Sequence, residues 1–178
     1  RLLVSTFIYS NNIEVRNNNL IKELLLNGND ADVCSLSKLV IDTYQEFSIE
    51  LLIELFEFVI SPAEKEVNGA VYTPQYVREF IVQGCFDNFP LDDWRNLRIA
   101  DISCGCGGFF ISIAEYLKNK IDTTYYDIYN HLYGVDIEEY SIERTKILLT
   151  LYAIQNGEDI EDFTFNLFCG NSLNFDWT

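Results

Sequence analysis

The chain has 178 residues, of which 48% are hydrophobic and 15% are aromatic. This composition predicts a folded globular chain and excludes an intrinsically disordered one. The formal net charge of −16 argues against a segment that grips nucleic acid with its own surface, because such affinity comes largely from neutralising phosphates.

Five cysteines, an odd number in a chain with no visible export signal, argue against a disulfide framework. Cys104 and Cys106 are spaced like metal ligands, but no second pair follows and His131 is the only histidine, so we predict free thiols and no bound metal. The longest apolar stretch, residues 47–60, contains three glutamates and is too short to span a bilayer. We therefore expect a cytoplasmic protein without a membrane partner.

Residues 1–68 are predicted to form a helical region that Asn-rich breaks divide. Amphipathic runs at 20–26 and 36–60 are its helix candidates, and the apolar stretch 47–60 is predicted to be buried or to face a partner. Residues 61–64 combine a serine cap, a first-turn proline and a glutamate three residues after the serine. This pattern predicts another helix start.

From residue 69 onward, strand and helix patterns alternate. Strands are predicted at 97–103, 132–137 and 163–169, and helices at 109–118 and 139–155, with Gly157 as a helix stop. The inward face of the first helix is predicted to carry Phe110, Ile113, Ala114 and Leu117. Strands that alternate with helices in this order predict an α/β fold with a parallel sheet and right-handed crossovers.

A glycine-rich loop lies between the first predicted strand and its helix. It reads Asp-Ile-Ser-Cys-Gly-Cys-Gly-Gly-Phe-Phe over residues 101–110. Glycines permit a tight turn and a close backbone approach, and the amide groups at a helix start favour an anionic ligand group, so a nucleotide-like ligand is predicted here. Phe110 takes the place of the last glycine of the dinucleotide pattern, which disfavours a pyrophosphate. A turn that serves chain geometry alone is the open alternative.

The second predicted strand ends in Gly134-Val135-Asp136-Ile137. An acid at this position can hold a ribose, since one carboxylate can accept hydrogen bonds from both hydroxyls. Asp136 is therefore the ribose candidate, and a solvated or helix-capping aspartate is the alternative. The Tyr-rich residues 121–130, which lengthen the spacing from the loop, are interpreted as an insertion.

The segment Gly69-x-x-Tyr72-Thr73-Pro74 precedes these two motifs, and three motifs in order are more specific than one. Together they resemble the amino-methylating, adenine-specific DNA methyltransferases of restriction-modification systems, over about residues 69–175. The resemblance implies part of a Rossmann-like sheet, preceded by the helical region, with S-adenosylmethionine as the cofactor. By position it implies cofactor contacts from Tyr72, Thr73, Pro74, Asp101, Ser103, Cys104, Gly105, Gly107, Phe109, Asp136 and Ile137.

Local physics gives the Tyr-Thr-Pro segment a second interpretation that is compatible with the first. Thr73 can cap a helix that begins with Pro74, and the buried face of this helix would then carry Val77, Phe80 and Ile81.

Two departures from the family pattern follow the third predicted strand. The family usually has Gly-Asp where this chain has Gly170-Asn171, and the amide of Asn171 can still bond an adenine edge, so we keep it as a cofactor contact. The family's Asn or Asp followed by Pro-Pro and an aromatic residue is expected beyond residue 178, so no catalytic residue is assigned. Residues 69–178 are thus predicted to be a truncated cofactor-binding part of the methyltransferase domain.

The expected function is that of a fragment of a site-specific DNA adenine methyltransferase, inactive by itself. Duplex DNA would be bound by parts of the parent outside this chain, and the helices of residues 1–68 are candidates for docking a specificity or restriction subunit. Two alternatives stay open. One is a methyltransferase for a small molecule, RNA or protein, and the other is a non-catalytic interaction module with residues 47–60 as its contact face.

Overall fold

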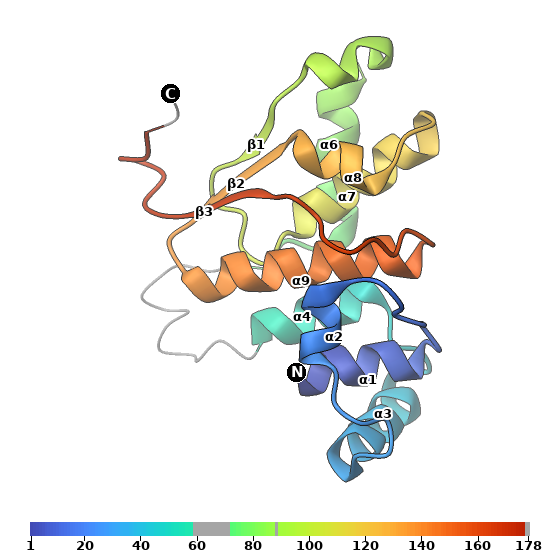
Figure 1. The fold of residues 1–178 in the computed structure, drawn as a ribbon. Helices are drawn as coiled ribbons and strands as arrows, with labels where there is room; N and C mark the ends of the chain where they lie inside the picture. Colours follow the sequence, from blue (N-terminus) through green and yellow to red (C-terminus); the bar gives the residue numbers. More distant parts are fainter. Residues whose placement is uncertain (59–71, 88, 177–178) are drawn as a thin grey trace.

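A computed structural model describes residues 1–58, 72–87 and 89–176 (Figure 1). The first helices are α1 (Leu2–Ser10), α2 (Asn19–Leu24), α3 (Ala31–Tyr44) and α4 (Ile49–Phe58). The later helices are α6 (Gln75–Phe86), the short 3-10 helix η1 (Leu91–Asn96), α7 (Gly108–Lys120), α8 (Tyr125–Asn130) and α9 (Glu139–Gln155). The strands are β1 (Ile99–Asp101), β2 (Leu132–Asp136) and β3 (Asn166–Cys169). The helix start predicted at 61–64 and Gly69 lie outside the described residues.

The described strands form one parallel sheet in the order β1-β2-β3, which confirms the predicted α/β fold. Asp101 pairs with Gly134 across β1 and β2, and Asp136 pairs with Cys169 across β2 and β3, so the carboxyl ends of the strands meet at one edge. Two strands begin later than predicted. Phe163 and Phe165 pack their rings against Tyr129 instead of joining the hydrogen-bonded ladder.

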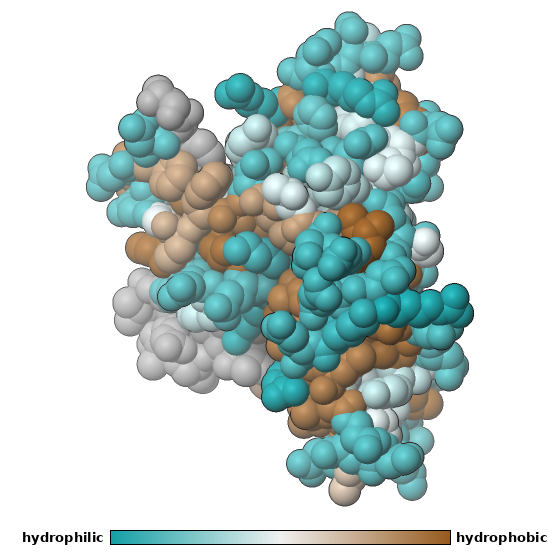
Figure 2. All heavy atoms as spheres, in the orientation of Figure 1, coloured by the Kyte–Doolittle hydropathy of each residue, from teal (hydrophilic) through white to brown (hydrophobic). Residues whose placement is uncertain are grey.

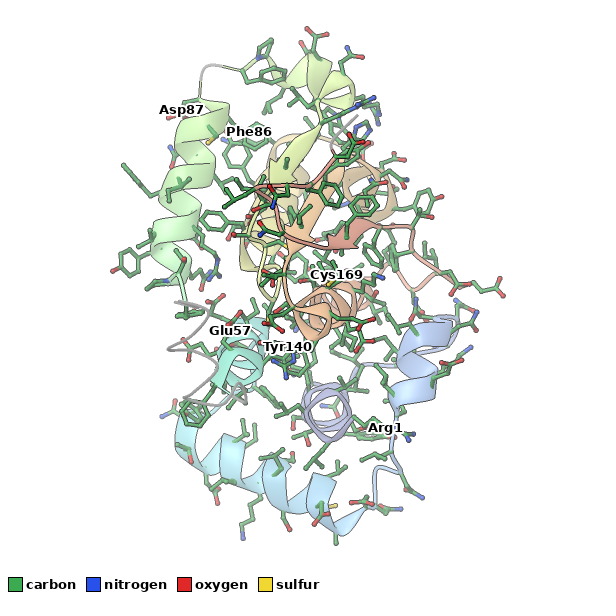
Figure 3. The ribbon with its side chains drawn as sticks, turned by 90° about the vertical axis from the view of Figure 1, so that its left-hand side faces the viewer. Arg1, Glu57, Phe86, Asp87, Tyr140 and Cys169 are labelled. Atoms are coloured by element: carbon green, nitrogen blue, oxygen red, sulfur yellow. The ribbon has the colours of Figure 1, made fainter. Side chains whose placement is uncertain are left out.

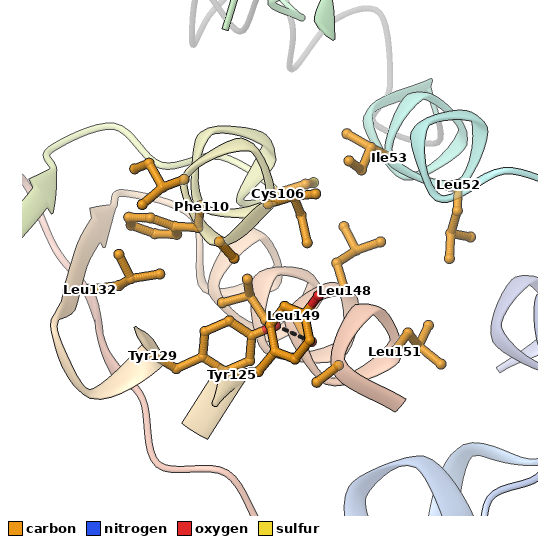
Figure 4. Close-up of a cluster of buried hydrophobic side chains, with 14 of the residues drawn as sticks. Leu52, Ile53, Cys106, Phe110, Tyr125, Tyr129, Leu132, Leu148, Leu149 and Leu151 are labelled. Carbon is orange, nitrogen blue, oxygen red and sulfur yellow. Dashed lines mark hydrogen bonds between the residues drawn. The ribbon is translucent and has the colours of Figure 1, made fainter. Parts of the chain in front are cut away.

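Helices α7 and α9 carry much of the core that lies against the sheet. The predicted inward residues of α7 are all buried, with Phe110 and Leu117 fully enclosed. Residues 121–130, interpreted from sequence as an insertion, contain α8, whose Tyr129 is 1% exposed and donates a hydrogen bond of 2.8 Å to the carbonyl of Leu149 on α9 (Figure 4). Tyr129 therefore belongs to the core, because its hydroxyl group finds a hydrogen-bond partner inside the protein.

The predicted end of α9 at Gly157 is confirmed in detail. Gly157 has φ = +88°, the left-handed region that favours glycine. Its amide bonds the carbonyl of Ile154, and the amide of Glu158 bonds the carbonyl of Ala153. These two bonds satisfy carbonyls of the last helical turn, which otherwise lack partners.

The run predicted at 36–60 is two helices, at least as far as residue 58. The chain breaks at Gln45, which has φ = +69°, and α4 restarts where the hydroxyl of Ser48 accepts the amide of Leu51. Leu52 and Ile53 of α4 are buried, so the described part of the stretch 47–60 lies mainly in the protein's own core.

The helices before residue 58 and the sheet region share one hydrophobic core. That core joins Phe7 and Leu52 to Phe110 and Leu148. The helices α1 to α4 therefore do not form a core of their own. The boundary predicted at residue 68 falls among residues that are not described and stays a prediction. Within the described ranges, no helix is both long and apolar enough to cross a membrane.

The buried face of α6 differs from the prediction. Arg78, Val82 and Phe86 are buried, whereas Phe80 is 79% exposed and Ile81 is 44% exposed. The residue before the helix is Pro74 rather than Thr73, and no side chain caps this helix start. The reason is that α6 turns Arg78 towards α7, which rotates the predicted apolar face outward.

Arg78 makes this orientation possible because its charge is neutralised inside the protein. Its side chain is 3% exposed, and its Nη2 atom lies 2.6 Å from Oε2 of Glu50 on α4. The Nε atom also donates to the hydroxyl of Ser112 on α7. A buried guanidinium requires such partners, since an unpaired buried charge is strongly destabilising.

We predict that Glu50→Ala destabilises the protein by about 3 kcal/mol, because it leaves the guanidinium of Arg78 buried without its counter-charge. Urea unfolding followed by circular dichroism measures this free energy. Glu54→Ala, an exposed change on the same helix, is the matched control and should leave the stability nearly unchanged. Equal stabilities of the two variants would contradict the prediction.

Candidate cofactor-binding site

The glycine loop between β1 and α7 has the backbone geometry for which glycine is needed. Gly105 has φ = +50° and Gly107 has φ = +82°, and side chains disfavour both conformations. The amide of Cys104 bonds the carbonyl of Val135 next to it on β2, and Gly107 stands directly before α7. The loop is thereby fixed between the end of the sheet and a helix start.

Thr145 of helix α9, a fully buried residue, packs against the loop. Its hydroxyl donates to the carbonyl of Gly105 over 2.8 Å. A Cβ atom on Gly107 would lie 2.7 Å from Cγ2 of Thr145, so a larger residue could not occupy that position without displacing α9. Helix α9 therefore dictates a glycine at position 107.

Asp136, at the end of β2, is bonded to the same loop. Its Oδ2 atom accepts the amide of Gly105 at 2.9 Å, and its Oδ1 atom accepts the amide of Glu138 at 3.0 Å. A carboxylate has about four acceptor positions, so two lone pairs remain for other donors. The aspartate thus orders the loop in addition to any role towards a ligand.

A pocket opens beside this loop. It is lined by Ile53 and Glu57 of α4, by Tyr72, Thr73 and Arg78, and by Ser103, Cys104, Gly105, Cys106, Gly108 and Phe109. Six of the predicted contacts, namely Tyr72, Thr73, Ser103, Cys104, Gly105 and Phe109, are thus brought to one place. They come from segments about thirty residues apart, which the packing of α6 on α7 holds together.

The other predicted contacts lie around this pocket rather than in its lining. Pro74 starts α6, and Gly107 faces Thr145. Asp101 accepts the amide of Ser103 and lies along a second groove, beside β1 and α6. Ile137, the residue after Asp136, is 61% exposed. Asn171 is exposed beyond β3, and its side-chain oxygen accepts the amide of Leu173.

Several side chains that sequence patterns did not indicate also belong to the site. Glu57 stands on α4, and its Oε1 atom accepts the amide of Cys106 at 3.2 Å. Figure 3 labels Glu57 at the end of α4, between the first helices and the strands. Thr145 and Arg78 complete the set. Only the tertiary packing could reveal Glu57, because nothing in the spacing relates it to a loop almost fifty residues later.

Ionisable groups at the loop are shifted towards their neutral forms. Burial raises the pKa of the Cys104 thiol to about 12, and burial together with Glu57 raises the pKa of the Cys106 thiol. Burial, and then the charge of Asp136, also raise the pKa of the Asp101 carboxyl group. Neutral thiols are poor nucleophiles and poor metal ligands. In the described ranges, no three His, Cys, Asp or Glu residues are grouped as metal ligands.

Residues 48–178 match the family described as N-6 DNA Methylase. The chain belongs to this family. The match starts at the head of α4, so the N-6 DNA methylase region includes the helix that carries Glu50 and Glu57 as well as the segment recognised from its motifs.

The similar proteins include one known from its sequence and one of known structure. A protein of Methanocaldococcus jannaschii, whose name describes a type II restriction enzyme and methyltransferase, is 35% identical over 47% of this chain and 9% of its own length. The type IIL restriction-modification enzyme MmeI, solved in complex with DNA, has a similar fold, with a TM-score of 0.51 and 14% identity. That likeness covers 98% of this chain and 32% of MmeI, so the chain spans a small part of either relative.

We predict that iodoacetamide at about pH 8 labels the exposed Cys34, Cys85 and Cys169 of the folded protein and spares Cys104 and Cys106, because the latter two thiols are buried and protonated. Mass spectrometry of the digested protein locates the labels. In denaturant all five cysteines should react. Rapid labelling of Cys104 in the folded chain would show that the loop is open.

Proposed function

We propose that this chain is the cofactor-binding part of a site-specific DNA adenine methyltransferase of a restriction-modification system. The observation that carries the proposal is the pocket where Tyr72 and Thr73 meet the glycine loop, in a chain of the N-6 DNA methylase family. Two segments that the resemblance assigns to one cofactor are thus adjacent. No observation favours a non-DNA acceptor or a non-catalytic module.

The pocket and its surroundings suit S-adenosylmethionine, which supplies an electrophilic methyl group on a sulfonium when it is bound. Asp136 keeps acceptor positions for the ribose hydroxyls, beside the exposed Ile137. Asn171 follows Gly170, whose amide bonds the carbonyl of Asp136, so an adenine contact is proposed for it next to the ribose. Tyr72 and Thr73 are proposed to border the methionine end, with Phe109 and the loop amides.

In the parent, the methyl acceptor is proposed to be the exocyclic amine of an adenine flipped out of duplex DNA. The family's Pro-Pro signature, which would hold that amine, is expected outside this chain, so we propose that the segment binds cofactor without turning over. Its net charge of −16 supports the proposal that other parts of the parent bind the DNA. Hydrophilic side chains cover much of the face in Figure 2, with apolar ones in separate patches.

A specificity or restriction subunit remains the proposed partner of the N-terminal helices. Most of the described stretch 47–58 is buried, with Leu52 and Ile53 in the core, and Phe58 at its end is 77% exposed. Helix α3 also offers apolar side chains for such a contact, because Leu39 is 62% exposed and Tyr44 is 54% exposed.

We predict that calorimetry detects binding of S-adenosylmethionine and of its demethylated product S-adenosylhomocysteine, but not of NAD. The affinity expected for an incomplete site is in the high micromolar range, about −5 to −6 kcal/mol. NAD should fail because the loop lacks the glycine pattern that receives a pyrophosphate. Tighter binding of NAD than of S-adenosylhomocysteine would refute the proposed cofactor.

Asp136→Ala should lower the affinity for S-adenosylhomocysteine by about a hundredfold, since two charge-assisted hydrogen bonds to the ribose are lost. The thermal midpoint should fall as well, because the amides of Gly105 and Glu138 lose their acceptor. Glu139→Ala, an exposed change at the start of α9, is the control and should alter neither quantity much. An unchanged affinity of the folded Asp136→Ala protein would leave Asp136 with a structural role alone.

A further inference from the structure

Three carboxylates stand around the glycine loop, and they differ in what they face. Asp136 lies at the end of β2 and bonds the amides of Gly105 and Glu138. Asp101 bonds the amide of Ser103 and borders the groove along β1. Among the described residues, Glu57 is the only carboxylate that lines the pocket with Tyr72 and Thr73.

Glu57 is held in this position by the packing of α4. Glu50, Ile53 and Glu57 stand three and four residues apart and therefore share one face of the helix. Glu50 on that face is tied to Arg78, and Ile53 lines the same pocket. The carbonyl of Phe56, the residue before Glu57, accepts a hydrogen bond of 2.8 Å from Nη1 of Arg144 on α9. This bond fixes the end of α4 against α9.

The carboxylate of Glu57 touches the loop itself. Its Oε1 atom accepts the amide of Cys106, and it would lie 3.3 Å from a Cβ atom on Gly105. One carboxylate offers about four acceptor positions, so the bond to Cys106 leaves capacity for a further donor. A ligand that enters between Tyr72 and the loop therefore meets a negative charge.

We propose that Glu57 binds the α-ammonium group of the amino-acid end of S-adenosylmethionine and thereby selects ligands that carry an amino acid. This inference rests on the proposed function. An ammonium group that leaves water for a partly enclosed site needs a paired negative charge, and Glu57 supplies it beside the segment assigned to the methionine end. The first helical part of the chain then contributes directly to cofactor recognition.

The test compares two ligands on the full chain. Calorimetry with S-adenosylhomocysteine reports the whole ligand, and ligand-observed NMR with 5′-methylthioadenosine reports the nucleoside thioether without its amino acid. Glu57→Gln keeps an acceptor for the amide of Cys106 and removes the charge. Glu54→Gln is the matched control, because Glu54 lies one turn earlier on α4 and is exposed.

Glu57→Gln should weaken S-adenosylhomocysteine binding by about tenfold to a hundredfold and leave 5′-methylthioadenosine binding unchanged, while Glu54→Gln changes neither. Unchanged S-adenosylhomocysteine binding would overturn the inference. Tighter binding would also overturn it, since Glu57 would then compete with the ligand for the loop amide. Equal loss of both ligands would reduce Glu57 to a structural role. A wild-type chain that binds neither ligand would instead contradict the proposed function, and the inference with it.

Discussion

The buried guanidinium of Arg78 connects the three helices on which the site depends. It pairs with Glu50 on α4, donates to the carbonyl of Thr73 before α6, and reaches Ser112 on α7. It also lies against Gly108, where a Cβ atom would come within 3.1 Å of its Nε atom. The charge therefore positions the Tyr-Thr-Pro segment, the start of α7 and the helix of Glu57 relative to one another. Its burial is tolerable because the bonds to Glu50, Thr73 and Ser112 each satisfy a donor of the guanidinium group.

The glycine loop is shaped by constraints that come from outside it. Thr145 leaves no room for a side chain on Gly107, and Asp136 captures the amide of Gly105. A loop held in this way is preorganised, so a ligand would not have to order it on binding. The proposed cofactor affinity would thus be coupled to loop stability through the same residues, which is why both quantities are to be measured for each variant.

Sequence patterns predicted the parts of the fold that follow from local periodicity and turn chemistry. The buried face of α7, the bounds of α9 and its stop at Gly157 are of this kind, because hydrophobic spacing and a left-handed glycine act within a few residues. The glycine loop and Tyr72 were predicted as ordered motifs, and the structure places both at one pocket.

The remaining features depend on partners that are distant in the chain. The face of α6 was predicted wrongly because an arginine is ordinarily assigned to solvent, and the counter-charge that buries Arg78 stands 28 residues earlier, on Glu50. Helix α8 was not predicted because the Tyr-rich residues 121–130 were interpreted only as an insertion, although Tyr129 finds an acceptor on α9. Glu57 could not be predicted for the same reason, since its place beside the loop is set by the packing of α4 alone.

The central claim is that α4, the Tyr-Thr-Pro segment and the glycine loop form one cofactor pocket. Hydrogen–deuterium exchange of the chain with and without S-adenosylhomocysteine tests it most directly. The account predicts that the ligand slows exchange in peptides covering residues 50–57 and 103–109 together. Protection confined to the groove beside β1, or protection of the loop without any change in α4, would contradict it.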